Sequence, residues 1–484
     1  MCCCGYGADV VVNPYQSYQT IMGWGAGGGL YGGITGGMVD PAIADAVNYQ
    51  YLDYLADDLG LTGSRTWEVG PRVDGTGMDH GDCDVIDWNL FETDTLPASQ
   101  LNYLLYFQNK VLAKGYVPNF YSSPGYPTHA SDQKPWIVNH PGERAQQLWA
   151  NALYFKTNFA ININYAVIDN EPSGSYTPTV LADDIKALGP RFVAQGLSTK
   201  VQYAEAVAPQ TDWGYITPVQ NDPEMWPWVG RISYHNYGTA DPYRTYLRDF
   251  GKGRSLTTAQ TEMGDPSYDD LFNDLTLSNV AYWEVAFSGS ATLTPNSGLT
   301  AFTPAAKFFR LHQLIHYVRP GAVRLGALAS DPSLRVMAFA QTNGTTALIE
   351  NTSSSAQTVN VSGLPPGTYG VSQSAGAPFQ EFGIRSVTGS GTLTLTNVLH
   401  NSGVTTVYPY SGPNHAPSIL VWGANPGYVV APTNSAVLSV TANDAELDIL
   451  SYLWSVASQP NGAHATLVSS NAAVTTANGL AAPG

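Results

Sequence analysis

The chain of 484 residues has few charged side chains, and their signs are unevenly balanced. Only 12% of its residues are charged, and 21 Lys and Arg stand against 38 Asp and Glu, which gives a net charge of −17. So acidic a chain lacks the basic surface that binds nucleic acids or anionic membranes. We therefore expect no nucleic-acid partner, and a strongly anionic substrate is disfavoured.

Long apolar runs and informative cysteine patterns are also missing. No run of 18 apolar residues occurs, so we expect no membrane insertion. The four cysteines, Cys2, Cys3, Cys4 and Cys83, suit neither a disulfide framework nor a zinc site, and Cys83 is predicted to be a loop thiol. Residues 1–5 lack the features of a signal peptide, so we expect that export information is missing or that the true start differs.

Apolar and turn-forming residues are abundant instead. Hydrophobic residues make up 44% of the chain and aromatic residues 11%, with 48 Gly and 32 Pro. This composition predicts a large core in a loop-rich β or α/β protein. The length exceeds one ordinary domain and suits a barrel with smaller modules. We expect a secreted or extracellular monomer.

Strand and helix patterns alternate over residues 14–317. Helices are predicted over 43–59, 98–114, 142–156, 180–188 and 303–317, and strands over 61–67, 116–121, 165–169, 201–205, 231–235, 255–262 and 280–284. Gly60 and Gly115 follow the first two helices as terminators. The alternation favours a (β/α)₈ TIM barrel, with an open doubly wound sheet as the alternative. The glycines of 23–29 are interpreted as a tight loop at the barrel rim, because the rest of a dinucleotide-binding fingerprint is missing.

Short alternating strands replace this pattern after residue 317. They are predicted over 334–341, 345–351, 357–361, 367–373, 391–399 and 404–408, and Asn343-Gly344 is typical of a hairpin turn. We predict a β-sandwich over 318–411, joined by an N-terminal strand within residues 1–13. Segment 412–484, with strands expected over 437–444 and 450–454, is interpreted as a partial immunoglobulin-like module.

Two glutamates each close a predicted strand. The apolar run Tyr165–Ile168 leads into Asn170 and Glu171, and the strand from Ser255 ends at Glu262. The carboxyl ends of barrel strands carry catalytic residues. Glu262 follows Glu171 by 91 residues, or three βα units of roughly 30 residues each, which places the two on strands 4 and 7. Two carboxylates facing each other across a barrel mouth can hydrolyse a glycosidic bond.

The chain resembles glycoside hydrolase family 30, a family of retaining (β/α)₈ glycosidases, over residues 9–410. The matching segments are Gln19–Gly25, Ser123-Pro124, Asn170–Pro172, Tyr234–Tyr237, Gln260–Glu262 and Phe308–Arg324. The resemblance implies a barrel that leads into a side β-sandwich joined by the N-terminal strand. Segments 67–70 and 74–76 also resemble the related galactocerebrosidases, which leaves the subfamily open.

The resemblance also implies roles for single residues. Glu171 would be the acid/base and Glu262 the nucleophile, and Asn170 would hydrogen-bond the 2-hydroxyl of the sugar. Tyr237 would hold the nucleophile through its hydroxyl.

Two further polar residues have open alternatives. Arg65 would keep Glu262 ionised, and a plain structural ion pair is the alternative. For His235, contact with the sugar and a satisfied core histidine are equally open.

Aromatic residues are concentrated near the same strand ends. They are Trp24, Trp67, Tyr121, Tyr126, Trp213, Trp226, Trp228 and Trp283. Because sugar rings stack on aromatic faces, we expect a glycan cleft. Trp24 and Trp283 are favoured as substrate platforms and Tyr121 as a further contact, with burial in the core as the alternative.

The remaining acidic residues are interpreted as non-catalytic. Glu68, Glu205 and Glu284 end strands and are candidates only for a supporting role. The acidic clusters, Asp79, Asp82 and Asp84 and then Asp444 and Asp448, are predicted to be solvated loops, with calcium binding as the alternative. No cofactor and no metal are expected.

We predict a retaining β-glycosidase that acts by double displacement on a neutral polysaccharide or glycoconjugate. β-1,6-Galactan, β-1,6-glucan, unsubstituted xylan and glycolipid are the candidate substrates. No Lys or Arg lies between Arg254 and Lys307, which argues against a specificity for glucuronoxylan. The alternative is a non-catalytic carbohydrate-binding or cell-surface adhesion protein.

Overall fold

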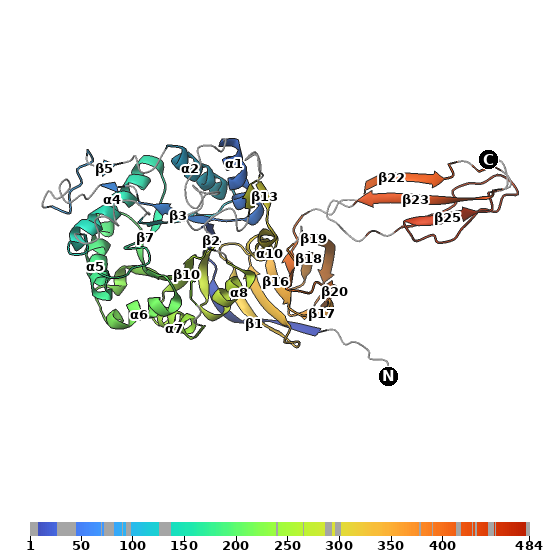
Figure 1. Ribbon diagram of the computed structural model, residues 1–484. Helices are drawn as coiled ribbons and strands as arrows, with labels where there is room; N and C mark the ends of the chain where they lie inside the picture. The colour runs from blue at the N-terminus through green and yellow to red at the C-terminus, as the bar shows by residue number, and fades with distance from the viewer. Residues whose placement is uncertain are drawn as a thin grey trace.

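Figure 1 shows the computed structural model of the chain, with a barrel, a large β-sheet and a smaller β-sheet in chain order. The structure describes residues 8–26, 45–68, 70–71, 82–89, 91–92, 98–124, 137–238, 241–264, 266–285, 293–295, 302–376, 379–389, 391–412, 418–427, 429–430, 433–443, 450 and 452–480. Several predictions lie outside them, namely those for Cys2, Cys3, Cys4, Asp79, Tyr126, Asp444 and Asp448 and for the side chain of Trp67.

Eight parallel strands close into a barrel in the order β10-β11-β2-β3-β6-β7-β8-β9. Their bounds are β2 (Gly23–Ala26), β3 (Gly63–Trp67), β6 (Asn119–Ser123), β7 (Ile163–Val167), β8 (Lys200–Ala206), β9 (Val229–His235), β10 (Thr257–Glu262) and β11 (Val280–Val285). The predicted (β/α)₈ barrel is confirmed, and the open sheet is wrong. Counted along the chain from β2, β7 is the fourth barrel strand and β10 the seventh.

A helical segment follows each barrel strand. The helices are α1 (Asp45–Asp53) continuing into η1 (Tyr54–Leu59), α2 (Ala98–Ala113), α4 (Pro141–Phe159), α5 (Pro178–Ala194), α6 (Pro209–Val219), α7 (Asp241–Lys252), α8 (Tyr268–Leu277) and α10 (Ala306–Ile315). Their apolar faces pack on the barrel in one cluster. Gly60 and Gly115 take left-handed backbone angles with φ of 88° and 79°, as expected for helix terminators. Among the described residues, no helix has the length and apolar character needed to cross a membrane.

Short elements decorate the barrel. They are η2 (Trp226–Trp228) and two small ladders, β4 (Gly70–Pro71) with β5 (Phe91–Glu92) and β12 (Leu293–Pro295) with β13 (Phe302–Pro304).

The rim loop predicted for residues 23–29 is wrong for its first four residues, which form β2. The glycines serve close packing inside the barrel. A Cβ at Gly25 would lie 2.0 Å from the hydroxyl of Tyr282, so no larger residue fits there without displacing that ring.

The second assembly is a continuous nine-stranded sheet in the order β19-β18-β21-β16-β15-β14-β1-β17-β20. Its strands are β1 (Ala8–Thr20), β14 (Val323–Ala329), β15 (Leu334–Gln341), β16 (Gly344–Asn351), β17 (Gln357–Ser362), β18 (Gly367–Ser374), β19 (Gln380–Val387), β20 (Leu393–Val398) and β21 (Gly403–Pro409). The N-terminal strand β1 pairs antiparallel with β14 and parallel with β17. Because β1 bridges them, hydrogen bonding is unbroken where a β-sandwich of two sheets was expected. Val371 of β18 and Leu395 of β20 still share one core.

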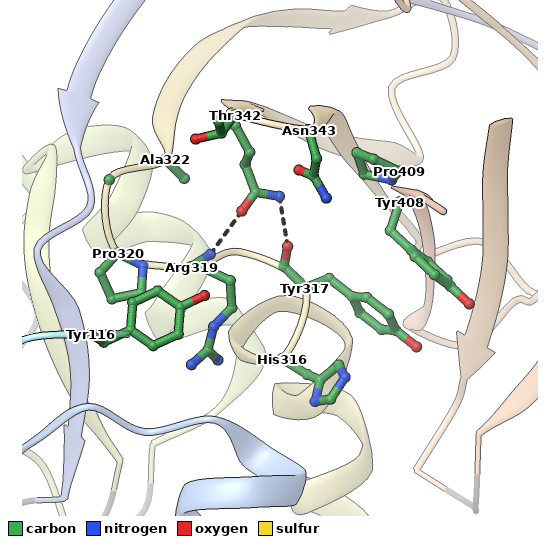
Figure 2. A pocket seen from close by; sticks show the side chains of 12 residues that line it. Tyr116, His316, Tyr317, Arg319, Pro320, Ala322, Thr342, Asn343, Tyr408 and Pro409 are labelled. Atoms are coloured by element: carbon green, nitrogen blue, oxygen red, sulfur yellow. Dashed lines mark hydrogen bonds between the residues drawn. The ribbon is translucent and has the colours of Figure 1, made fainter. Parts of the chain in front are cut away.

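The barrel meets this sheet at the segment after α10 (Figure 2). The side chain of Gln341 accepts a hydrogen bond from the Arg319 N–H at 3.0 Å and donates one to the Tyr317 carbonyl at 2.8 Å. The Arg319 guanidinium donates to the Gly60 carbonyl at 2.8 Å and lies over the ring of Tyr116, 4.8 Å from its centroid. These contacts surround a cavity of about 440 Å³ and tie the sheet to the base of the barrel.

The third assembly is a four-stranded sheet in the order β22-β23-β25-β24. Its strands are β22 (Ser418–Asn425), β23 (Ser435–Asn443), β24 (Thr466–Leu467) and β25 (Val474–Asn478). The predicted strand over 437–444 corresponds to β23. The strand predicted over 450–454 is wrong for the residues described there, which are not in a strand. The immunoglobulin-like interpretation stays a prediction.

Candidate active site

Glu171 and Glu262 lie at the carboxyl ends of the fourth and seventh barrel strands. Glu171 comes shortly after β7, and Glu262 is the last residue of β10. One carboxylate oxygen of each lies within 4.8 Å of the other and of a His235 ring nitrogen. The backbone of Glu171 is left-handed, with φ of 51°, and its N–H donates to the Glu205 carbonyl at 3.1 Å. Left-handed backbone is uncommon outside glycine and concentrates at functional sites.

The Glu262 carboxylate is held on both oxygens. Arg65 Nη1 donates to Oε2 at 2.6 Å, and the Tyr237 hydroxyl donates to Oε1 at 3.1 Å. The Glu262 side chain is only 6% exposed. Such charge-assisted hydrogen bonds are short and set the orientation of the carboxylate. This arrangement restricts the motion of the Glu262 side chain.

Arg65 lies beneath the site with its side chain fully buried. Its Nε donates to the Tyr121 hydroxyl at 2.9 Å and Nη2 to the Thr261 carbonyl at 3.3 Å. Burial alone would lower the pKa of Arg65, but the neighbouring acidic groups, Glu262 among them, raise it. A buried cation is tolerated when its donors are satisfied and an anion lies close. Arg65 therefore forms buried ion pairs, and one of its partners is Glu262.

His235, the last residue of β9, is fully buried between carboxylates. Its Nδ1 lies 2.8 Å from Glu171 Oε1 and 3.4 Å from Glu262 Oε1, and its Nε2 lies 3.5 Å from Glu205 Oε1. Burial alone would lower the pKa of His235, but these carboxylates raise it to about 9. The hydrogen bond from His235 in turn lowers the pKa of Glu171. His235, a candidate site residue from the sequence, is thus in contact with three acidic side chains.

Two buried glutamates complete the network from below. Glu205 Oε2 accepts from Gln202 at 2.8 Å, and although burial opposes it, hydrogen bonding and charge from His235 lower the Glu205 pKa to about 2. Glu284 accepts from the hydroxyls of Tyr121 and Tyr282, both at 2.9 Å, and burial raises its pKa to about 7. The sequence predicts only a supporting role for these two glutamates. Their position at the ends of predicted strands was the one sequence feature that indicated a place near the site.

The turn after β9 places Tyr237. The Asn236 N–H donates to the Glu262 carbonyl at 3.0 Å, and the Tyr237 N–H donates to the Val207 carbonyl at 3.2 Å. Arg244 donates to the side chain of Asn236 at 2.6 Å and to Asp274 at 2.8 Å. The turn is therefore anchored to the end of β10, to the segment after β8 and to helix α7.

The segment before Glu171 is anchored by an arginine on helix α4. Arg144 Nε donates to the Ile168 carbonyl at 2.9 Å, and its two Nη atoms each donate to Glu68 at 2.9 Å. Glu68 is thus the partner of a structural arginine. Asn170 accepts from the Ser123 hydroxyl at 3.4 Å and lies half-buried beside Glu171.

Trp24 and Trp283, predicted as substrate platforms, are both 0% exposed and belong to the barrel–helix core. Their indole N–H groups donate to the Val318 carbonyl at 2.6 Å and to Asp274 at 3.0 Å. This prediction is wrong, because side chains alternate along a strand. On β11 the side chains of Tyr282 and Glu284 face the barrel interior, so Trp283 between them faces the helices.

The prediction that Tyr121 contacts the substrate is also wrong. Its ring is 0% exposed inside the barrel, and its hydroxyl links Arg65 to Glu284. It supports the site from beneath. Three other aromatic candidates, Trp213, Trp226 and Trp228, are partly buried against the core.

The acidic loop and its cysteine have protein partners. Asp84 pairs with Arg191 at 2.7 Å, and Cys83 is a free thiol 3.1 Å from Glu143, as predicted for a loop thiol. Among the described residues, Glu171, His235 and Glu262 are the group whose donor atoms are close enough to hold a cation. Arg65 binds Glu262 Oε2 and already supplies the positive charge that a metal ion would bring there.

Comparisons with known proteins rest on structure alone. No family model and no curated protein sequence matches the chain. Among solved structures it is similar to a glycoside hydrolase family 30 subfamily 8 xylanase from Clostridium acetobutylicum, with 19% identity, a TM-score of 0.61, and 82% of this chain and 98% of that chain covered.

Two more solved structures have comparable similarity. For the catalytic domain of the family 30 xylanase C from Talaromyces cellulolyticus, identity is 16%, the TM-score is 0.62, and 83% of this chain and 100% of that chain are covered. For an endo-β-1,6-glucanase the values are 17%, 0.59, 83% and 94%. At these identities the similarity shows a shared fold, a (β/α)₈ barrel with an additional β-sheet domain.

Proposed function

We propose that the protein is a retaining β-glycoside hydrolase, with Glu262 as nucleophile and Glu171 as acid/base. The observation that carries this proposal is the pair of carboxylates at the barrel mouth, with one oxygen of each within 4.8 Å of the other. Carboxyl groups about 5–5.5 Å apart belong to retaining enzymes, whereas inverting enzymes need about 6.5–9.5 Å to admit a water. The short separation therefore supports double displacement.

The different surroundings of Glu262 and Glu171 support different roles, nucleophile and acid/base. Glu262 is nearly buried and held as a carboxylate by Arg65 and Tyr237, which suits attack on the anomeric carbon. The side chain of Glu171 is 35% exposed, which leaves it open to a leaving group and later to water. Asn170, next to it, is in place to hydrogen-bond a sugar hydroxyl. Attack by Glu262 would form a glycosyl-enzyme ester, which water activated by Glu171 would then hydrolyse.

A neutral glucan, galactan or xylan is the substrate class we favour. The net charge of −17 disfavours a strongly anionic substrate, and no cation lies between Arg254 and Lys307 in the sequence. Similar structures include xylanases and an endo-β-1,6-glucanase, and one is described as an exported protein of Bacteroides fragilis. We infer that this chain also acts outside the cell.

A non-catalytic carbohydrate-binding or adhesion protein is the second candidate. The β-sheet assemblies beyond the barrel favour it, and Trp422 of β22 is 78% exposed, as an aromatic binding platform would be. Binding without turnover would identify such a protein.

The decisive experiment compares wild type, Glu171→Gln and Glu262→Gln on aryl β-glycosides and on xylan, β-1,6-glucan and β-1,6-galactan. We expect each variant to lose more than about a thousandfold in turnover of the polysaccharide that the wild type cleaves. Glu224→Gln, an exposed glutamate outside the site, is the matched control. Equal turnover by all four proteins would refute the two-carboxylate assignment, and glycan binding with no turnover would favour the second candidate.

Trapping identifies the nucleophile directly. A 2-fluoro glycosyl fluoride of the accepted sugar should add its glycosyl mass to the peptide that contains Glu262, because the fluorine at C2 slows both steps while the anomeric fluoride, a good leaving group, keeps formation of the ester fast. Label on another carboxylate would contradict the role of Glu262.

A further inference from the structure

The most unusual group in the site is His235, whose ring lies within 3.5 Å of charged groups from β3, β8, β10 and the segment after β7. Nδ1 faces Glu171 at 2.8 Å and Glu262 at 3.4 Å. Nε2 faces Glu205 at 3.5 Å and the guanidinium of Arg65, also at 3.5 Å. The ring is 0% exposed, and the ring of Tyr237 lies 6.2 Å away between centroids.

Counting charges shows why this histidine binds a proton. Three carboxylates and one guanidinium leave an excess of two negative charges around the ring, and an imidazolium reduces the excess to one. An uncompensated buried charge is costly, so the protonated ring is favoured despite its burial. The hydrogen bond between His235 and Glu171 contributes to both pKa shifts: it helps to raise the pKa of His235 to about 9, and it lowers the pKa of Glu171. The contact between Nδ1 and Glu171 is therefore an ion pair at neutral pH.

In this ion pair Glu171 carries no proton, although a general acid must donate one in the first step. Glu171 must donate a proton to the departing sugar oxygen, and an acid suited to that task has a raised pKa. In the empty site, however, Glu171 is a carboxylate and the shared proton lies on His235. A hydrogen bond of 2.8 Å is short enough for the proton to pass between them.

We propose that His235 holds, in the empty site, the proton that Glu171 delivers to the leaving group. This inference rests on the proposed function and deepens it. His235 acts through Glu171 and does not touch the substrate, so it is a positioning and proton-holding residue. Glu205 keeps the ring in place from the Nε2 side, where Gln202 holds the Glu205 carboxylate.

The charges balance through both steps. As the bond between the anomeric carbon and the leaving oxygen breaks, Glu262 forms the ester and loses its negative charge. Glu171 takes up the proton from His235 Nδ1 and passes it to the leaving oxygen, so Glu171 ends the step as a carboxylate and the ring becomes neutral. One negative and one positive charge disappear together, and the net charge of the buried cluster stays the same. The attraction of Glu262, which holds the ring proton, ends when that proton is needed.

The second step runs in reverse. Glu171 removes a proton from water and passes it to His235 while the water oxygen bonds to the anomeric carbon. The bond from that carbon to Glu262 breaks and restores the carboxylate. The site returns to its starting protonation state with no net gain or loss of protons.

The test compares leaving groups that do and do not need a proton. For wild type, His235→Gln and Glu171→Gln, kcat/KM is measured on dinitrophenyl and methyl β-glycosides of the sugar that the wild type accepts. We expect His235→Gln to lose about a hundredfold or more on the methyl glycoside and less than about tenfold on the dinitrophenyl glycoside. Glu171→Gln should show the same bias, and His400→Gln, a half-buried histidine outside the barrel, should match the wild type.

A purely structural role for His235 would lower both rates by the same factor, and that result would overturn the inference. The bias is measured within each variant, so it remains readable if the variant is partly destabilised. A wild type without glycosidase activity would refute the proposed function instead, which separates the two failures.

Two further readouts address the proton itself. The alkaline limb of kcat/KM on the methyl glycoside should lie near pH 9 in the wild type and move toward acid by about two pH units or more in His235→Gln, because kcat/KM reports groups of the free enzyme. An unmoved limb contradicts the inference. Nitrogen chemical shifts of the labelled His235 ring should show the imidazolium at pH 7.5 in the empty protein, and a neutral ring there would overturn it independently of activity.

Discussion

Arg65 Nη1 lies 2.6 Å from Glu262 Oε2, and both side chains are removed from solvent. We expect Arg65→Lys to lower kcat/KM about a hundredfold, because lysine keeps the charge but cannot reach Glu262, Tyr121 and the Thr261 carbonyl together. Arg65→Met should also reduce the free energy of unfolding by about 3–5 kcal/mol, since it leaves buried carboxylates uncompensated.

Thermal unfolding and steady-state kinetics measure these effects. Arg248→Lys is the matched control, because Arg248 pairs with an Asp249 that is 59% exposed, and such pairs contribute about 0–1 kcal/mol. Full activity of Arg65→Lys would show that the charge alone suffices.

Tyr237→Phe removes the hydroxyl that donates to Glu262 Oε1 at 3.1 Å. A hydrogen bond to a charged group contributes about 1.5–3 kcal/mol, so kcat/KM should fall roughly tenfold to a hundredfold. Stability should change little, because Tyr237 is 46% exposed. Kinetics of this variant beside Tyr246→Phe, a tyrosine equally exposed on α7, check the result. Unchanged kinetics would remove Tyr237 from the site.

Glu284 should make stability depend on pH. Burial raises its pKa to about 7 from an ordinary value near 4.5, so its protonated form is favoured in the folded state. Its contribution to the free energy of unfolding is present below pH 4.5 and is lost as the pH rises through 7, with a total on the order of 3 kcal/mol. Denaturant unfolding of wild type and Glu284→Gln between pH 4.5 and 8 measures it. The variant should gain on the wild type as the pH rises, and a constant difference would contradict the buried acid.

Trp283→Phe tests the corrected position of this residue. The substitution removes the indole N–H that donates to Asp274 at 3.0 Å, while Arg244 and Tyr234 still bind that carboxylate. We expect a loss of about 1–3 kcal/mol in unfolding free energy and a KM within about twofold of the wild type. A raised KM at unchanged stability would instead favour the original interpretation as a sugar platform.

The barrel and its two glutamates could be predicted because their signals are local. The strand before Glu171 is a short, mostly apolar run, helices alternate with the strands, and Gly60 and Gly115 mark helix ends where the structure has them. Chain order then counts Glu171 onto the fourth strand and Glu262 onto the seventh, as the barrel shows. The same local signals failed for β2, because glycines that pack against Tyr282 look like loop residues in the sequence.

Local signals could not predict which side chains of a strand face the barrel interior and which face the helices. Strand parity separates the buried Trp283 from the interior Glu284, and a shift of one residue reverses it. An N-terminal strand was predicted to join the sheet, but its partners β14 and β17 are set by pairings between residues more than 300 positions apart, and no local pattern identifies them.

The sequence by itself determined the fold class and the two carboxylates, because both follow from residue patterns within single βα units. Only the tertiary structure decided how the site is charged. Closing the barrel brings together Arg65, Glu205, His235 and Glu262, which span almost 200 residues of the chain, at distances of 2.6–3.5 Å. At such distances inside a low-dielectric core, each ionised group sets the protonation of its neighbours.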